Sequence, residues 1–204
     1  MNAEEFLAVL RARRSVRRFR PEPVAHAVLE RLIEHAAWAP SASNRQDWLF
    51  IAVTREETRR ALGEAVRRRW SEMIAANRDA GWVAELERYA VHFSGFTAAP
   101  AVIGVACREP DELMKHLAGA EAVWVGGGAA SAAMAAQTLM LAAHAIGLGT
   151  CCMTGALAAQ DQLKSILGLG RRHEMVCLIA LGWPDEHPPA PPRKPTEEVL
   201  RFLE

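Results

Sequence analysis

The sequence lacks an excess of charge of either sign. Its 24 Lys and Arg residues balance 24 Asp and Glu residues, so the formal net charge at pH 7 is zero. Proteins that bind nucleic acid need a basic face to neutralise phosphates, and a balanced chain argues against that class. Half of the residues are hydrophobic, and 204 residues suffice for a large core. We therefore expect one domain that spans residues 1–204.

Cysteine is scarce and shows no spacing typical of metal or redox sites. The chain has four Cys residues and no C-x-x-C pair. The neighbours Cys151 and Cys152 would point to opposite faces of a strand, which suits neither a shared metal nor a disulfide. No signal peptide precedes them. We expect a cytoplasmic protein with four reduced, buried thiols, namely Cys107, Cys151, Cys152 and Cys177.

Several motifs of nucleotide-binding and hydrolytic enzymes are also missing. The segments Gly147-Leu148-Gly149 and Gly168-Leu169-Gly170 begin like G-x-G-x-x-G but lack its last glycine. The glycine run at residues 126–128 leads to no P-loop lysine. No H-E-x-x-H or G-x-S-x-G is present. The pattern therefore predicts no Rossmann dinucleotide site, no Walker ATPase, no metal site and no serine hydrolase.

One long stretch carries almost no charge. Between Ala122 and Gln160 only His144 is a basic or acidic side chain, and the stretch is long enough to span a bilayer. However, Gln137 and His144 interrupt it, glycines break it, and it is rich in alanine. We expect a buried helix followed by a buried strand, with no membrane span.

The spacing of apolar residues predicts alternating helices and strands around one sheet, which is an α+β fold. Residues 71–96 are predicted to be less regular, and the Pro-rich residues 184–195 to form an extended arm. Predicted helices cover residues 5–10, 24–38, 55–70, 129–146, 158–167 and 196–203. Predicted strands cover residues 48–54, 100–106, 150–153 and 173–183.

The segment Arg13-Arg14-Ser15-Val16-Arg17 concentrates three guanidinium groups and one hydroxyl. Arginine presents a rigid fork of donors that matches phosphate oxygens, and serine adds a donor at short range. The segment is therefore a candidate phosphate site, although a solvated basic surface or a weak nucleic-acid arm has the same composition. Arg193 in the Pro-rich arm would add a guanidinium to the same anion if the arm folds back.

Two further segments are small enough for a close approach of backbone to ligand. One is the loop from Pro40 to Asn44, and the other is the turn from Gly149 to Gly155. Taken singly, the first reads as an ordinary turn at a helix end and the second as a turn between a strand and a helix. Because they follow the arginine segment in this order along the chain, we interpret them as parts of one candidate binding site.

In this order the segments resemble the nitroreductase-like flavoprotein family along almost the whole chain. One departure is Asp47, since the family commonly has proline before the tryptophan that is Trp48 here. The segments that carry the resemblance are residues 13–17 (RRSVR), 38–48 (WAPSASNRQDW), 141–150 (LAAHAIGLGT), 180–184 (ALGWP) and 193–195 (RKP).

The resemblance implies a nitroreductase-like fold with a central mixed or antiparallel sheet flanked by helices. It also implies an intertwined homodimer that exchanges C-terminal arms. FMN is the implied cofactor, with NADH or NADPH as a transient electron donor. The implied FMN-binding residues are Arg13, Arg14, Ser15, Arg17, Pro40, Ser41, Ala42, Asn44, Met153, Thr154, Gly155 and Arg193, with Pro40 to Asn44 reaching the flavin of the partner subunit.

The implied activity is reduction of a flat conjugated substrate such as a nitroaromatic or a quinone. Thr154 is the candidate catalytic residue, because a hydroxyl that donates to flavin N5 favours one-electron chemistry; alternatively only its backbone N–H matters. Specialised alternatives are a desaturase, a reductive dehalogenase or a flavin-destroying enzyme that forms a benzimidazole, and a non-catalytic flavin module is a further one. Aromatic residues that form either a substrate lid or ordinary core are Trp70, Trp82, Tyr89, Phe93 and Phe96.

Overall fold

The computed structural model describes residues 2–109 and 127–203. Gly126, the first residue of the glycine run, therefore lies outside the described residues. Within this part of the chain, four strands form one sheet in the order β1-β2-β4-β3, and every neighbouring pair is antiparallel. The predicted α+β class and antiparallel sheet are thus confirmed. The strands are β1 (Trp48–Val53), β2 (Ala101–Arg108), β3 (Gly149–Met153) and β4 (His173–Gly182).

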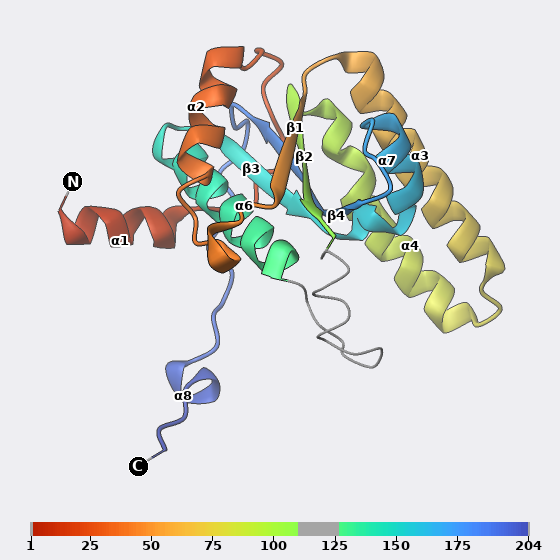
Figure 1. Cartoon of the computed structure of the whole chain (residues 1–204). Helices are drawn as coiled ribbons and strands as arrows, with labels where there is room; N and C mark the ends of the chain where they lie inside the picture. The colour runs from red at the N-terminus through yellow and green to blue at the C-terminus, as the bar shows by residue number, and fades with distance from the viewer. Residues whose placement is uncertain (1, 110–126, 204) are drawn as a thin grey trace.

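Helices cover both faces of this sheet (Figure 1). On one face, α2 (His26–Ala36) and α6 (Gly127–Ala145) bury apolar residues such as Leu32 and Leu139 against β2 and β4. On the other face, a second cluster contains Leu62 and Trp70. The helices that supply or cover this second cluster are α3 (Glu56–Ala76), α4 (Ala80–Ser94) and α7 (Gln160–Ile166).

In the described part of the uncharged stretch, a helix is followed by a strand, as predicted, but the helix buries only one face and Cys152 of the strand is exposed. Helix α6 ends at Ala145 and is followed by Gly147, whose φ of 84° suits glycine, and the Leu148 amide donates back to the Ala143 carbonyl at 2.9 Å. The chain then enters β3 directly. Among the described residues, no helix is long and apolar enough to cross a bilayer.

The prediction that residues 71–96 are irregular was wrong. Helix α3 continues to Ala76, and α4 follows after a break of three residues. The Asp79 side chain caps α4 by accepting from the Gly81 amide at 2.8 Å and the Trp82 amide at 3.3 Å. The apolar residues of α4 then pack on the second core cluster through Leu86, Ala90 and Phe93. Tertiary packing, rather than local pattern, therefore defines this helix.

The two chain ends project from the sheet (Figure 1). The predicted first helix is α1 (Ala3–Ala12), which has a capping box between Asn2 and Glu5 and buries no residue. The last helix is shorter than predicted, because α8 covers only Thr196–Val199. The remaining short elements are the 3-10 turns η1 (Ala42–Asn44), η2 (Gly95–Ala98) and η3 (Gly155–Ala159), the last of which replaces the start of the predicted helix 158–167.

Candidate functional site

The arginine segment is attached to the outer edge of β3. The Val16 amide donates to the Thr150 carbonyl at 2.9 Å, and Ser15 forms a parallel bridge with Thr150. Val16 is buried, and a Cβ atom on Gly149 would lie 2.8 Å from its side chain, so Gly149 allows this close approach. The backbone is fixed in this way while the neighbouring guanidinium groups remain at the surface.

The chain that follows β4 crosses the same segment and holds it from the other side. The Asp185 amide donates to the Arg18 carbonyl at 3.0 Å. The Glu186 carboxylate accepts from the Arg17 amide at 2.5 Å and from the Arg18 amide at 3.0 Å. Burial raises the pKa of Glu186, but these two hydrogen bonds and the charges of Arg18 and Arg17 outweigh it, so the pKa is lowered. Glu186 therefore stays ionised and clamps the segment.

The Pro-rich arm then forms one wall of a cavity of about 250 Å³, which we call the arm cavity. Arg193 lines it together with the arginine segment, so the arm folds back in the way that the sequence predicted. No acidic side chain is among its described lining residues. The arm cavity is lined by Arg13, Arg14, Ser15, Arg17, Pro188, Pro189, Pro191 and Arg193.

A second cavity of about 330 Å³ lies along β3, and we call it the edge cavity. Arg17 lines this cavity as well, so the two cavities share one residue. Because the Thr150 carbonyl points outward to Val16, strand alternation places the N–H and C=O groups of Cys152 on the same outer edge. The edge cavity is lined by Arg17, Arg88, Tyr89, Phe93, Cys151, Cys152 and Met153.

Aromatic rings form the wall of the edge cavity opposite β3. The Phe93 ring stacks on Trp70 at 5.5 Å and contacts Tyr89 at 5.9 Å between ring centroids. Trp70 is only 9% exposed, and its indole N–H donates to the Gly155 carbonyl at 3.1 Å. A Cβ atom on Gly155 would lie 2.4 Å from the Phe93 ring. The turn after β3 is therefore packed directly against this wall.

The other two aromatic residues predicted for a lid lie elsewhere. Phe96 is buried in the second core cluster and lines a smaller cavity of about 210 Å³, which Arg17 also lines. Trp82 is 63% exposed and lines neither the arm cavity nor the edge cavity. The structure thus brings Tyr89 and Phe93 to the edge cavity, with Trp70 stacked behind Phe93, but not Trp82.

Thr154 begins the turn η3 directly after β3. Its carbonyl accepts from the Leu157 amide at 2.9 Å, while its hydroxyl makes no capping bond to the turn. The residue is exposed, whereas Met153 before it is buried. The Thr154 hydroxyl is therefore able to turn toward a bound molecule, and its role stays a prediction.

The loop from Pro40 to Asn44 lies at the start of α6 and away from the arginine segment. The Ala42 amide donates to the Ser131 hydroxyl at 3.1 Å, and the Gln46 amide donates to the Ser41 hydroxyl at 2.7 Å. Ser43, Asn44 and Gln46 all have φ near +50°, which is uncommon for residues with a Cβ. Within the described chain, Pro40, Ser41, Ala42 and Asn44 line neither the arm cavity nor the edge cavity.

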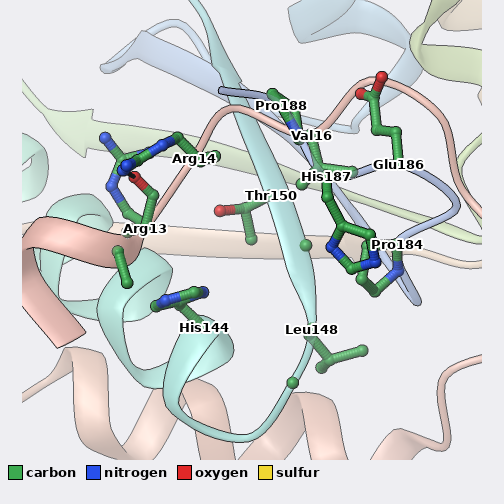
Figure 2. Close-up of a pocket in the computed structure, with 13 residues that line it drawn as sticks. Arg13, Arg14, Val16, His144, Leu148, Thr150, Pro184, Glu186, His187 and Pro188 are labelled. Atoms are coloured by element: carbon green, nitrogen blue, oxygen red, sulfur yellow. Dashed lines mark hydrogen bonds between the residues drawn. The ribbon is translucent and has the colours of Figure 1, made fainter. Parts of the chain in front are cut away.

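A third cavity of about 400 Å³ lies behind the arginine segment, between the end of α6 and the chain after β4 (Figure 2). Arg13, Arg14 and His144 lie on one side of it, and His187 and Glu186 lie on the other. Burial lowers the pKa of His144, and the charges of Arg13 and Arg14 lower it further. His144 is therefore neutral near pH 7 and adds no positive charge behind the segment.

The cysteine prediction was partly wrong. All four thiols are free, but Cys152 is exposed, because β3 is an edge strand and Cys152 faces away from the buried Cys151. The pKa of Cys152 is lowered, chiefly by a hydrogen bond with Cys177 and further by Arg13. Among the described residues, no group of His, Cys, Asp and Glu could hold a metal ion.

Sequence reasoning missed Arg88 and Glu186 as members of this site. Arg88 belongs to the helix that was predicted to be irregular, so its position opposite β3 had no local signal. Glu186 contacts Arg17 across 169 positions of the chain. Only the fold brings these partners together.

Comparison with known proteins gives one family. The model described as Nitroreductase family matches residues 10–183 of this chain. A protein named NADH dehydrogenase from Thermus thermophilus is 32% identical over 196 residues, covering 92% of this chain and 91% of its own. A 5,6-dimethylbenzimidazole synthase from Rhodospirillum rubrum is 30% identical over 187 residues, covering 90% and 84%.

Comparison with solved structures agrees. An FMN and NADPH-dependent nitroreductase from sphigopyxis sp. strain HMH superposes with a TM-score of 0.71 at 27% identity, and the match covers 100% of both chains. The predicted nitroreductase-like fold is thereby confirmed.

Proposed function

Because the chain belongs to the Nitroreductase family, we propose that it is an FMN-dependent oxidoreductase that takes electrons from NADH or NADPH. We further propose that it passes them to a flat conjugated acceptor such as a nitroaromatic or a quinone. The observation that carries this proposal is the position of Arg17, which lines both the arm cavity and the edge cavity. A phosphate and a flat ring of one molecule would fit these adjoining spaces.

The arm cavity has the chemistry that a phosphate requires. Its charged lining residues are all arginines, and Ser15 adds a short-range donor. Arg13, Arg14, Arg17 and Arg193 would hold the FMN phosphate through charge-assisted hydrogen bonds. Glu186 is turned to the backbone amides of Arg17 and Arg18, so it positions the segment.

The edge cavity suits a flat conjugated ring. The outer N–H and C=O groups of Cys152 offer one donor and one acceptor along β3, and Met153 and the turn Thr154-Gly155 continue this edge. The Phe93 and Tyr89 rings line the opposite side, where a second flat ring can stack beside the flavin. FMN, when bound, supplies the redox chemistry, while Arg17 places a fixed positive charge beside it.

The second copy of the chain is part of this proposal. The apolar residues Phe6 and Leu10 of α1 and Phe202 and Leu203 of the C-terminal segment are exposed, and such surfaces suit burial in a homodimer. In a dimer with exchanged arms, the fixed loop from Pro40 to Asn44 would complete the flavin site of the partner subunit. The free cysteines support a reducing, cytoplasmic location.

Anaerobic titration of the purified, FMN-loaded protein tests the proposal. We expect the visible flavin absorbance to bleach on addition of NADH or NADPH and to return with a nitroaromatic or a quinone. A bound flavin that neither nucleotide bleaches would point to another donor, a desaturase or a flavin-binding module without catalysis.

A second candidate function is destruction of the flavin itself, and the relationship to the 5,6-dimethylbenzimidazole synthase favours it. Such an enzyme consumes reduced FMN in the presence of oxygen and releases a benzimidazole. Mass spectrometry of an aerobic reaction with excess reduced FMN separates the two candidates. Recovery of all the FMN supports the oxidoreductase, and a benzimidazole product supports the synthase.

A further inference from the structure

We propose that the preferred acceptor is a planar aromatic molecule with an anionic substituent, and that Arg88 selects it by binding that anion. This inference rests on the proposed flavin site and adds the charge of the substrate. It follows from the arrangement of one face of α4 opposite the edge of β3.

The residues of this face are ordered by depth. Glu85, Tyr89 and Phe93 follow at intervals of four residues and share one side of the helix, and Arg88, next to Tyr89, lines the same cavity. Phe93 packs against Gly155 at the base of the edge cavity, and Tyr89 is 55% exposed above it. Arg88 lies five residues before Phe93, which is about 7.5 Å along the helix axis.

This spacing suits a small aromatic acid. A ring that rests against Phe93 and Tyr89 would direct a para substituent toward Arg88, while its opposite end stays near the turn after β3. The guanidinium fork can then bind a carboxylate with two parallel hydrogen bonds.

The charges around the edge cavity favour an anion. The charged residues that line it are Arg17 and Arg88. Arg17 also lines the arm cavity, where the FMN phosphate is proposed to bind. Arg88 is therefore the cation that remains for a second ligand.

Among the described residues, Arg88 is held by one exposed ion pair. It donates to Glu85 at 2.5 Å, and the two side chains are 70% and 52% exposed. Exposed pairs of this kind contribute little to stability, so a carboxylate placed against the aromatic wall can displace Glu85. Glu85 then acts as a competitor that weakens binding of the anionic substrate.

The test compares 4-nitrobenzoate with its neutral isostere 4-nitrobenzamide on the FMN-loaded enzyme. We expect the wild type to prefer the acid in kcat/KM by about tenfold or more, as a charge-assisted hydrogen bond allows. Arg88→Gln should remove most of this preference and change kcat/KM for the amide less than about twofold. Glu85→Gln should lower KM for the acid. Arg60→Gln breaks another exposed ion pair on a helix, that of Arg60 with Glu56, and should change kcat/KM for neither substrate.

Binding of benzoate and benzamide provides a readout without turnover. Both are titrated into the oxidised holoenzyme and followed by the flavin absorbance. Benzoate should bind more tightly than benzamide to the wild type, and high salt should reduce this difference in affinity. The Arg88→Gln variant should bind the two ligands with equal affinity.

Three results would overturn the inference. If the wild type had equal kcat/KM values for the acid and the amide and bound benzoate and benzamide equally, the site would not select an anionic substituent. If Arg88→Gln lowered kcat/KM equally for the acid and the amide, the role of Arg88 would be structural. A rise in KM for NADH or NADPH alone would assign Arg88 to the dinucleotide phosphates. If nicotinamides fail to bleach the flavin, the proposed function fails, while the benzoate titration still decides the role of Arg88.

Discussion

The two walls of the edge cavity are held together by different forces. On one side, β3 and the arginine segment are joined by backbone hydrogen bonds, and Glu186 fixes two more amides. On the other side, α3 and α4 are joined by ring packing between Trp70 and Phe93. The first wall should therefore keep its shape when side chains change, whereas the second should depend on side-chain volume. Mutations can test this difference directly.

The largest expected effect is on stability, at the aromatic wall. Trp70→Ala removes a buried ring and the donor to the Gly155 carbonyl, so we expect a loss of about 3–5 kcal/mol in the free energy of unfolding. Trp70→Phe keeps a ring and should cost less. Urea unfolding followed by circular dichroism measures both. Equal stability of Trp70→Ala and the wild type would contradict a wall held by ring packing.

The next effect is on flavin affinity, at the strand edge. Arg17→Gln removes a guanidinium but keeps the Arg17 amide that donates to Glu186, so the backbone should not move. We expect FMN affinity to fall about 10- to 100-fold, with little change in stability. Arg11→Gln, in the last turn of α1, is the matched control. If Arg17→Gln lowered stability as much as Trp70→Ala, the proposed difference between the two walls would be contradicted.

Low pH should destabilise the wall formed by β3 and the arginine segment. The pKa of Glu186 is lowered in the folded protein, so its contribution to stability is present above the unfolded pKa and is lost as pH falls through the folded one. We therefore expect FMN affinity and stability to fall below about pH 4. The Glu186→Gln variant should bind FMN less tightly and be less stable than the wild type at pH 7. It should lose less of its stability than the wild type on acidification. Titrations at several pH values in both proteins give the comparison, and parallel pH profiles would contradict it.

A smaller effect is expected at Thr154. Thr154→Val keeps the backbone N–H and the shape but removes the hydroxyl donor. If the hydroxyl reaches the flavin, the spectra recorded during photoreduction should change while FMN affinity stays within about threefold. Unchanged spectra would leave only the backbone N–H with a role.

The smallest effect is expected at Trp82. Its ring is exposed and lines neither cavity, so Trp82→Ala should change stability by no more than about 0.5 kcal/mol and leave substrate preference unchanged. Phe93→Ala is the matched contrast and should change both. A shift of substrate preference in Trp82→Ala would extend the lid beyond the wall seen here.

These two walls also differ in how far the sequence predicted them. The arginine segment and the turn after β3 follow from local patterns, because their chemistry lies in residue types at short spacing. The role of Arg193 was conditional on the arm folding back, which no local pattern shows. Helix α4 was missed, because its definition depends on packing against α3 and η3 as well as on Asp79 as a cap. Arg88 was missed with it. Glu186 was missed because its partners are distant in the chain.

The most direct test of the account is an equilibrium titration of the flavin-free protein with FMN and with riboflavin, which lacks the phosphate. If the arm cavity holds a phosphate and the edge cavity a ring, FMN should bind at least about 100-fold more tightly than riboflavin. Arg17→Gln should reduce that ratio. Equal affinity for the two flavins, or binding of neither, would contradict the central claim that Arg17 joins the two ends of one FMN site.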